Sequence, residues 1–177
     1  MNHLPLKKIS DDVFLATDDI IRLDYRAIKF IKEKAAYSSR GRARICAHKD
    51  AKDILHEMVI AIRSDSYIRP HRHHNKVESF HLIEGRADIV ILNDDGDILD
   101  VVKLGNEYCF YYRLVMPYYH TLLIYSPILV IHEITNGPFD INAADFALFS
   151  PAEHDKAKSD EYVLALKNKV MAYATSG

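Results

Sequence analysis

The 177-residue chain contains no tryptophan, only two cysteines and no long apolar run. Cys46 and Cys109 are too few for a disulfide scaffold and do not form a Cys-x-x-Cys pair, so they fit a reducing compartment. No segment approaches the ~20 apolar residues that span a bilayer, and the first residues lack the apolar core of a secretory signal. We therefore expect a cytoplasmic protein without a membrane partner.

A strong excess of either charge is also missing, because the formal net charge is −2. Surfaces that bind nucleic acid normally show a basic excess, so we expect no nucleic-acid partner. The chain length favours a single domain over residues 1–177, large enough to bury a core of its own.

Histidine, in contrast, is abundant, with ten in the chain, and three metal-binding side chains stand close together in the sequence. His71 and His73 are two residues apart, so on a strand both side chains point to the same face. Glu78 opens the next extended segment and can return to the same centre after the turn His74-Asn75-Lys76. Two imidazoles and a carboxylate are typical of a non-haem Fe(II) site, and a further imidazole would also suit Mn, Ni or Zn.

The apolar pattern predicts a mostly β chain between two helices. A helical stripe covers residues 17–37, and another forms a helical tail over 151–175, with Ser150 and Glu153 as a capping box. Between them, over 42–150, the period changes to two, and Asn93 to Gly96 form a hairpin turn. The predicted strands are 43–48, 56–63, 66–70, 78–84, 86–93, 98–104, 107–113, 119–125 and 128–135. Many short strands at this spacing indicate a sandwich or barrel, and a jelly roll satisfies the pattern.

The spacing His-x-His-x4-Glu-x6-Gly, from His71 to Gly85, resembles the first motif of the cupins. This resemblance implies an all-β double-stranded β-helix, or jelly-roll barrel, with both helices packed outside. It also implies a fourth ligand from a second motif, and Arg113 to Thr121 offers His120 in that role. The second motif departs from the cupin pattern, because Pro117 stands where a glycine is usual and Ile124 where an asparagine is expected.

Further segments resemble the WbuC-type cupin metalloproteins over roughly residues 18–153. They are Arg40 to His48, His56-Glu57-Met58, Tyr67 to His73, Glu78 to His81, and Glu133 to Phe139. Proteins of this type are often associated with O-antigen and other surface-polysaccharide gene clusters. The resemblance implies a metal-binding protein in that context, without specifying a reaction.

Other polar side chains could support a metal centre or bind its substrate. Glu57 and Glu133, which the resemblance includes, are predicted as general bases or as partners that orient a ligand imidazole. His48, His56 and His132 are either hydrogen-bonded strand residues or such partners, and the sequence does not decide between these roles. The arginines predicted to recognise an anionic substrate are Arg42, Arg44, Arg69 and Arg113.

Three functions remain open from the sequence. The first is a metal-dependent enzyme acting on a sugar, a nucleotide sugar or another small polar or anionic molecule, as an isomerase, an epimerase or an O2-dependent oxygenase. The second is a non-catalytic cupin that binds a metal or metabolite in an accessory or regulatory role. The third is a cupin whose metal only stiffens the barrel. A homodimer is expected, with contacts through outward side chains near the second motif, where tyrosines cluster.

Overall fold

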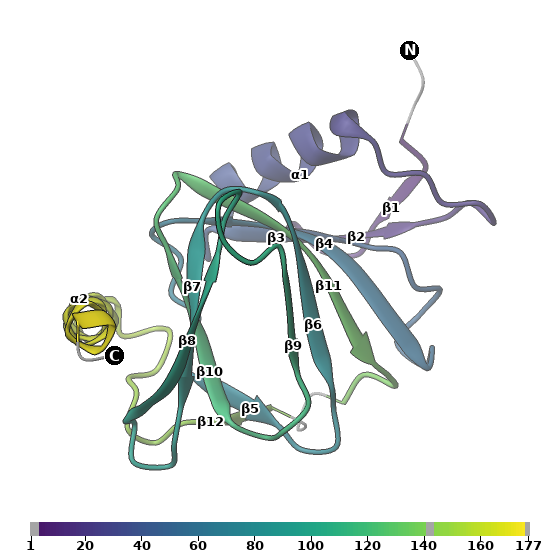
Figure 1. Cartoon of the computed structure of the whole chain (residues 1–177). Coiled ribbons are helices and arrows are strands. Elements are labelled where there is room, and N and C mark those ends of the chain that lie inside the picture. The colour runs from purple at the N-terminus through teal and green to yellow at the C-terminus, as the bar shows by residue number, and fades with distance from the viewer. Residues whose placement is uncertain (1–3, 141–143, 176–177) are drawn as a thin grey trace.

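The computed structural model describes residues 4–140 and 144–175, which form two β-sheets and two helices (Figure 1). The chain is therefore mostly β. The prediction of an all-β chain is too narrow, because both helices contribute buried side chains to the core.

The larger sheet contains seven strands in the order β1-β2-β3-β4-β11-β6-β9. They are β1 (Leu6–Lys8), β2 (Val13–Ala16), β3 (Arg42–Cys46), β4 (Leu55–Arg63), β6 (Glu78–Glu84), β9 (Tyr111–Leu114) and β11 (Ile128–Asn136). All neighbouring strands are antiparallel except β2 and β3, which are parallel. The strands β1 and β2, which precede the first helix, were not predicted from the sequence.

The smaller sheet contains five strands in the order β12-β5-β10-β7-β8, all antiparallel. They are β5 (His71–His73), β7 (Ala87–Leu92), β8 (Ile98–Leu104), β10 (Tyr119–Ile124) and β12 (Ala144–Phe146). The strand predicted at 66–70 is wrong, since the paired segment in this region is β5. The hairpin turn is confirmed, because the Asn93 N–H donates to the Asp97 carbonyl at 3.0 Å.

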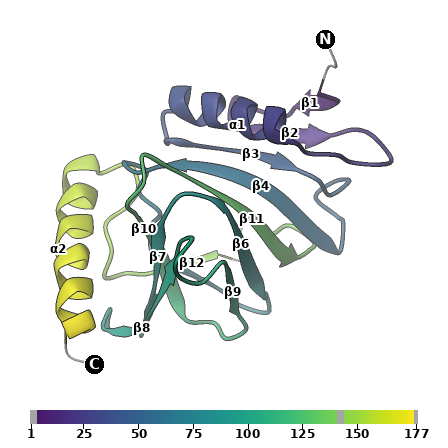
Figure 2. The ribbon, with the colours of Figure 1, turned by 45° about the horizontal axis from the view of Figure 1, so that its top comes forward.

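The two sheets face each other and enclose the central apolar core, to which β4, β6, β7, β10 and β11 contribute (Figures 1 and 2). The chain passes from the larger to the smaller sheet after β6, at Gly85. This glycine has φ +98°, and a Cβ there would lie 2.6 Å from the Ile128 carbonyl oxygen. The motif therefore ends in glycine because no other residue fits this turn.

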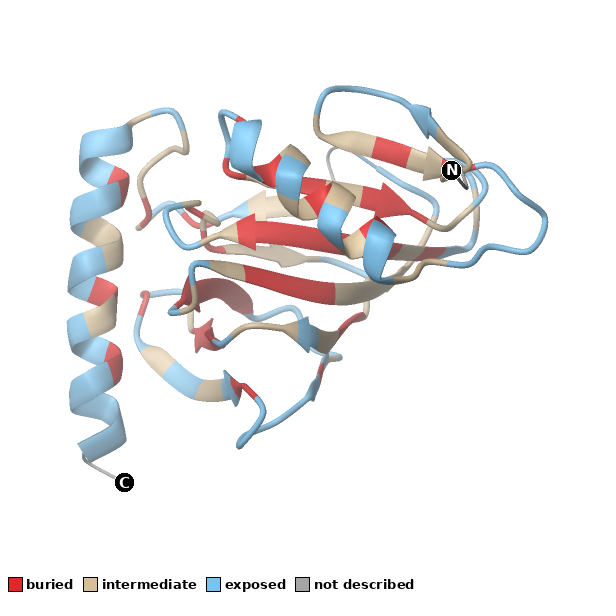
Figure 3. Cartoon of the chain, turned by 90° about the horizontal axis from the view of Figure 1, so that it is seen from above, coloured by how far each residue is buried: buried red, intermediate tan, exposed pale blue. Residues whose placement is uncertain are grey.

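Helix α1 (Tyr25–Tyr37) covers the outer face of β3, β4 and β11 and buries Ala27, Ile31 and Ala35 against them (Figure 3). It begins later than the predicted residue 17. Asp24 is the N-cap, and its side chain accepts a hydrogen bond from the Arg26 N–H at 2.9 Å. Ile20 fits the helical spacing but lies outside the helix and is 64% exposed.

Helix α2 (Lys156–Thr175) lies against the other outer face, over β7, β8 and β10, and buries Leu166 and Val170. The predicted capping box is wrong. The Ser150 hydroxyl donates to the Ala147 carbonyl, and Glu153 binds arginines of β3 and the segment before it. Asp155 takes the capping position instead, accepting from the Lys158 N–H at 3.3 Å.

Candidate metal centre

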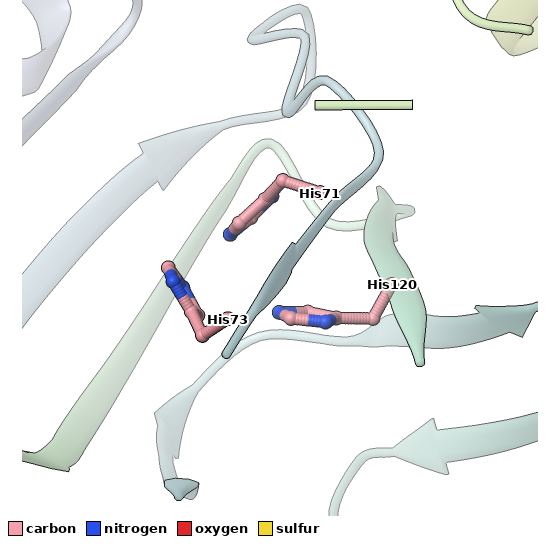
Figure 4. A group of neighbouring side chains, drawn as sticks. All are labelled: His71, His73 and His120. Carbon is pink, nitrogen blue, oxygen red and sulfur yellow. The ribbon is translucent and has the colours of Figure 1, made fainter. Parts of the chain in front are cut away.

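Three of the four predicted metal ligands come together on the inner face of the smaller sheet. His71 and His73 point the same way from β5, and His120 lies on β10 directly opposite His71 in the strand register. Their imidazoles converge, and one ring nitrogen from each lies within 4.8 Å of the others (Figure 4). The His-x-His spacing thus produces the common face that strand parity predicts.

Two of these imidazoles are held by backbone carbonyls that fix which nitrogen can bind a metal. His71 donates from Nδ1 to the Arg69 carbonyl at 2.9 Å, and His120 donates from Nδ1 to the Tyr118 carbonyl at 3.2 Å. A carbonyl only accepts hydrogen bonds, so each Nδ1 carries the proton and each Nε2 keeps a lone pair. Histidines that bind a metal usually donate such a hydrogen bond from the ring nitrogen that does not bind the metal.

The carboxylate of Glu78 approaches one of these histidines from the opposite sheet. Its Oε2 lies 2.8 Å from Nε2 of His120, and both side chains are buried. A carboxylate oxygen and an imidazole nitrogen this close to one another can bind a common cation. Three imidazoles and one carboxylate are a donor set that suits a divalent transition metal.

Burial and charge act in opposite directions on these groups. Burial lowers the pKa of His71 to about 4, so this imidazole is neutral at physiological pH. Burial would raise the pKa of Glu78, but the neighbouring histidines, His120 first, lower it to about 2. The negative charge of Glu78 in turn raises the pKa of His120 despite its burial. The site therefore holds an anionic carboxylate ready to balance a cation.

Of the two predicted glutamates, Glu133 lies beside the metal centre and Glu57 does not. On β11, Glu133 is in register with Met58 and Phe80, two core residues between the sheets. Burial, together with the charge of Glu78, raises the pKa of Glu133 to about 8. Glu57 belongs to the opposite parity of β4, and its carboxylate pairs with His132 at 3.6 Å on the outer face. Glu57 therefore lies outside the candidate site.

The other histidines that the structure describes lie outside the ligand set. His56 is buried and stacks on His48, with ring centroids 4.0 Å apart, near the end of the sheet. His81 stacks on His132, at 5.9 Å, on the outer face of the larger sheet. His74 follows β5 and is within 3.5 Å of the Asp145 carboxylate.

The four predicted substrate-binding arginines occupy different places. Arg42 and Arg69 are engaged in the structure: Arg42 binds Glu153 and the Tyr67 carbonyl, and Arg69 binds the Ala147 carbonyl and Ser150. Arg113 contacts the Ser79 hydroxyl at 3.4 Å near the edge of the larger sheet. Arg44 is in register with the core residue Ile60, and its positive charge partly offsets the upward shift in the pKa of Glu133.

Two further polar residues face the interior and were missed from the sequence. Cys46 and Tyr112 stand in the same cross-sheet row as Glu133, from β3 to β9. The Tyr112 hydroxyl is buried and makes no hydrogen bond to the described residues. Strand parity relative to Glu78 could have indicated Tyr112, but only if the pairing of β6 with β9 had been known.

Comparison with known proteins gives one family model and several distant structural neighbours. The family model described as "Domain of unknown function (DUF6016)" matches residues 23–104, and no curated protein matches the sequence. A crystal structure of a Shewanella oneidensis protein is similar, with TM-score 0.49 and 11% identity over 68% of this chain and 77% of that chain.

Two further solved structures are similar at a lower level. The capsular polysaccharide assembling protein CapF of Staphylococcus aureus has TM-score 0.46 and 17% identity over 58% of this chain and 34% of that chain. The Cnp3 cupin domain of Schizosaccharomyces pombe has TM-score 0.43 and 7% identity over 54% and 64%. The structural neighbours therefore include a cupin domain, and this chain spans about a third of CapF. Within the described residues, neither helix is long and apolar enough to cross a membrane.

Proposed function

We propose that this chain is a cupin metalloprotein of the WbuC type that holds one divalent transition-metal ion through His71, His73, His120 and Glu78. The convergence of three imidazoles on one point, with a buried carboxylate 2.8 Å from one of them, carries this proposal. Two facing sheets of interleaved strand order support a jelly-roll barrel around the site. The donor set is compatible with Fe, Mn, Ni or Zn.

We further propose that the metal centre is catalytic and acts on a small polar or anionic molecule such as a sugar or nucleotide sugar. Four protein ligands leave coordination positions open on a metal that prefers five or six, where it would polarise a carbonyl or hydroxyl of the substrate. Glu133 is buried beside Glu78 with a pKa near neutrality, so it can take up or release a proton. The WbuC-like segments support a place in surface-polysaccharide biosynthesis.

The second candidate is a non-catalytic cupin that binds a metal or metabolite as an accessory protein. The burial of the ligand cluster favours it, since His120 and Glu78 are almost closed to solvent. Substitution of Glu133 separates the two functions. In an enzyme, Glu133→Gln lowers turnover and leaves metal content unchanged. In a non-catalytic binding protein, Glu133→Gln leaves both the metal content and the ligand affinity unchanged.

The metal site itself is tested by elemental analysis of purified protein and of His73→Ala. We expect one equivalent of a transition metal per wild-type chain and its loss in His73→Ala, because three remaining ligands bind less tightly. His81→Ala, on the outer face of the larger sheet, is the matched control and should keep the metal. Equal metal content in His73→Ala and wild type would place the ion elsewhere. Activated sugars, screened in air and without oxygen, then address the reaction.

A further inference from the structure

The outer face of the larger sheet is only partly covered by helix α1. The helix packs on β3, β4 and the first part of β11, where Ile128 and Val130 lie under it (Figure 1). Beyond this cover, the side chains that alternate with the core residues Phe80 and Tyr112 and their neighbours point outward, and no helix of the described chain lies over them. We call them the outer patch: Leu55 and Glu57 of β4, Ser79, His81 and Ile83 of β6, Tyr111 and Arg113 of β9, and His132 and Ile134 of β11.

The outer patch has the composition of a contact surface. Leu55, Ile83 and Tyr111 are 48, 41 and 39% exposed, although their side chains are apolar or aromatic. Aromatic residues and arginine are enriched in protein interfaces and lysine is depleted, and the patch contains no lysine. Three rings cross it in one line, with centroids 4.8 Å apart from Tyr111 to His81 and 5.9 Å apart from His81 to His132. Rings held in this way lose little conformational entropy when a partner covers them.

The two charged residues of the outer patch that differ in sign stand at opposite ends of one cross-strand row. The row runs from Glu57 through Ile134 and Ser79 to Arg113. Three strand spacings separate its ends, or roughly 14 Å. Within the chain, the Glu57 carboxylate is 3.6 Å from the His132 imidazole, and Arg113 contacts the Ser79 hydroxyl at 3.4 Å. Both contacts are long, so each charge is available to a partner.

A second copy of the chain complements this arrangement. If two copies pack face to face about a two-fold axis that runs along the strands between β6 and β11, the row of one copy meets its own reversed image. Glu57 of each copy then lies opposite Arg113 of the other. In the adjacent row, the register of β11 with β6 sets His81 of one copy opposite His132 of the other. The patch is therefore complementary to itself, as a symmetric dimer requires.

We propose that the chain forms a homodimer through the outer patch, in which Glu57 of each subunit pairs with Arg113 of the other around a centre of histidine, tyrosine and isoleucine side chains. The proposal does not depend on the metal centre, which lies on the opposite face of the larger sheet. It gives a role to Glu57 and Arg113, which both point away from that centre. A patch four strands wide is at the small end of specific interfaces, so we expect a Kd on the order of micromolar.

Charge reversal and charge exchange test the pairing. Sedimentation velocity of the full chain from ~1 to ~200 µM should show wild-type protein passing from monomer to dimer. Arg113→Glu sets two carboxylates opposite each other, and Glu57→Arg sets two cations, so each should raise the Kd by about tenfold or more. The double variant Glu57→Arg/Arg113→Glu restores opposite charges, and its Kd should return to within about threefold of wild type.

Arg22→Glu and Glu161→Arg are the matched controls, at exposed positions outside the outer patch, and should keep the wild-type Kd. Thermal midpoints measured by circular dichroism show whether each variant is folded. If a charge reversal unfolds the chain, Arg113→Gln replaces it and should raise the Kd by about threefold or more. A wild-type monomer at every concentration would overturn the proposal. So would a dimer that folded single variants do not weaken, or one that the double variant does not restore.

Discussion

At the scale of single residues, strand parity decides which polar side chains share the metal centre. Glu57 and Glu133 have adjacent histidines in the sequence and equal standing in the WbuC-like pattern. The register of β4 with β11 sets Glu133 opposite Met58, so Glu133 points inward and Glu57 outward. Sequence alone predicts that one member of each His-Glu pair faces inward. It does not indicate which, because the choice depends on pairing between segments far apart in the chain.

Glu133 should make the stability of the metal-free protein fall as the pH rises. Its pKa is raised from 4.5 to about 8, mainly by burial, so the folded chain keeps a proton that the unfolded chain releases. Stability is therefore lost between these two pH values, at a rate of at most about 1.4 kcal/mol per pH unit. In Glu133→Gln this contribution is absent.

Urea unfolding of both apoproteins at several pH values checks this expectation. The stability of Glu133→Gln minus that of wild type should increase from pH 5 to pH 8. Taking the difference cancels the opposite contribution of His71, whose lowered pKa makes stability rise with pH between about 4 and 6.5. Glu161→Gln, at an exposed position on α2, should show no such trend. A pH-independent difference would mean that Glu133 is ionised in the folded protein.

At the scale of elements, caps and partners set the boundaries that apolar spacing leaves open. The stripes in both helices are confirmed at Ala27, Ile31 and Ala35 and at Leu166 and Val170. The N-terminal ends of both helices differ from the prediction. Asp24 caps α1, and Glu153 pairs with Arg40 and Arg42 and does not cap α2. Strands β1 and β2 are short and pair through contacts that local pattern does not reveal.

The observed start of α1 and the start expected from the apolar spacing predict different effects of substituting Asp24 and Asp19. Asp24→Ala should lower the free energy of unfolding by about 1 kcal/mol, because the Arg26 N–H loses its acceptor. Asp19→Ala should change it little, since Asp19 is exposed and lies before the helix. Chemical denaturation of the two variants compares them. A larger loss in Asp19→Ala would place the start of the helix near residue 17, as the apolar stripe predicts.

At the scale of the whole molecule, the proposed ligands join the two sheets. Glu78 belongs to the seven-stranded sheet, and the three histidines belong to the five-stranded one. The sequence predicts this set of four residues from spacing and resemblance. It does not predict that the side chains of Arg44, Cys46 and Tyr112 face the interior, because their direction depends on how β3 and β9 pair with strands far apart in the sequence.

A metal that bridges the sheets should stabilise the entire fold, so chelation should lower the thermal midpoint. Free metal at 100 times its Kd adds about 2.7 kcal/mol, which corresponds to a difference of roughly 5–10 °C for a chain of this size. In Glu78→Gln, the ion keeps only ligands from one sheet, and the difference between metal-loaded and chelated protein should shrink. Glu107→Gln, an exposed substitution, should keep the full difference. Scanning calorimetry with and without chelator measures both. If Glu78→Gln retains the wild-type difference, the carboxylate does not ligate and the ion is held by the five-stranded sheet alone.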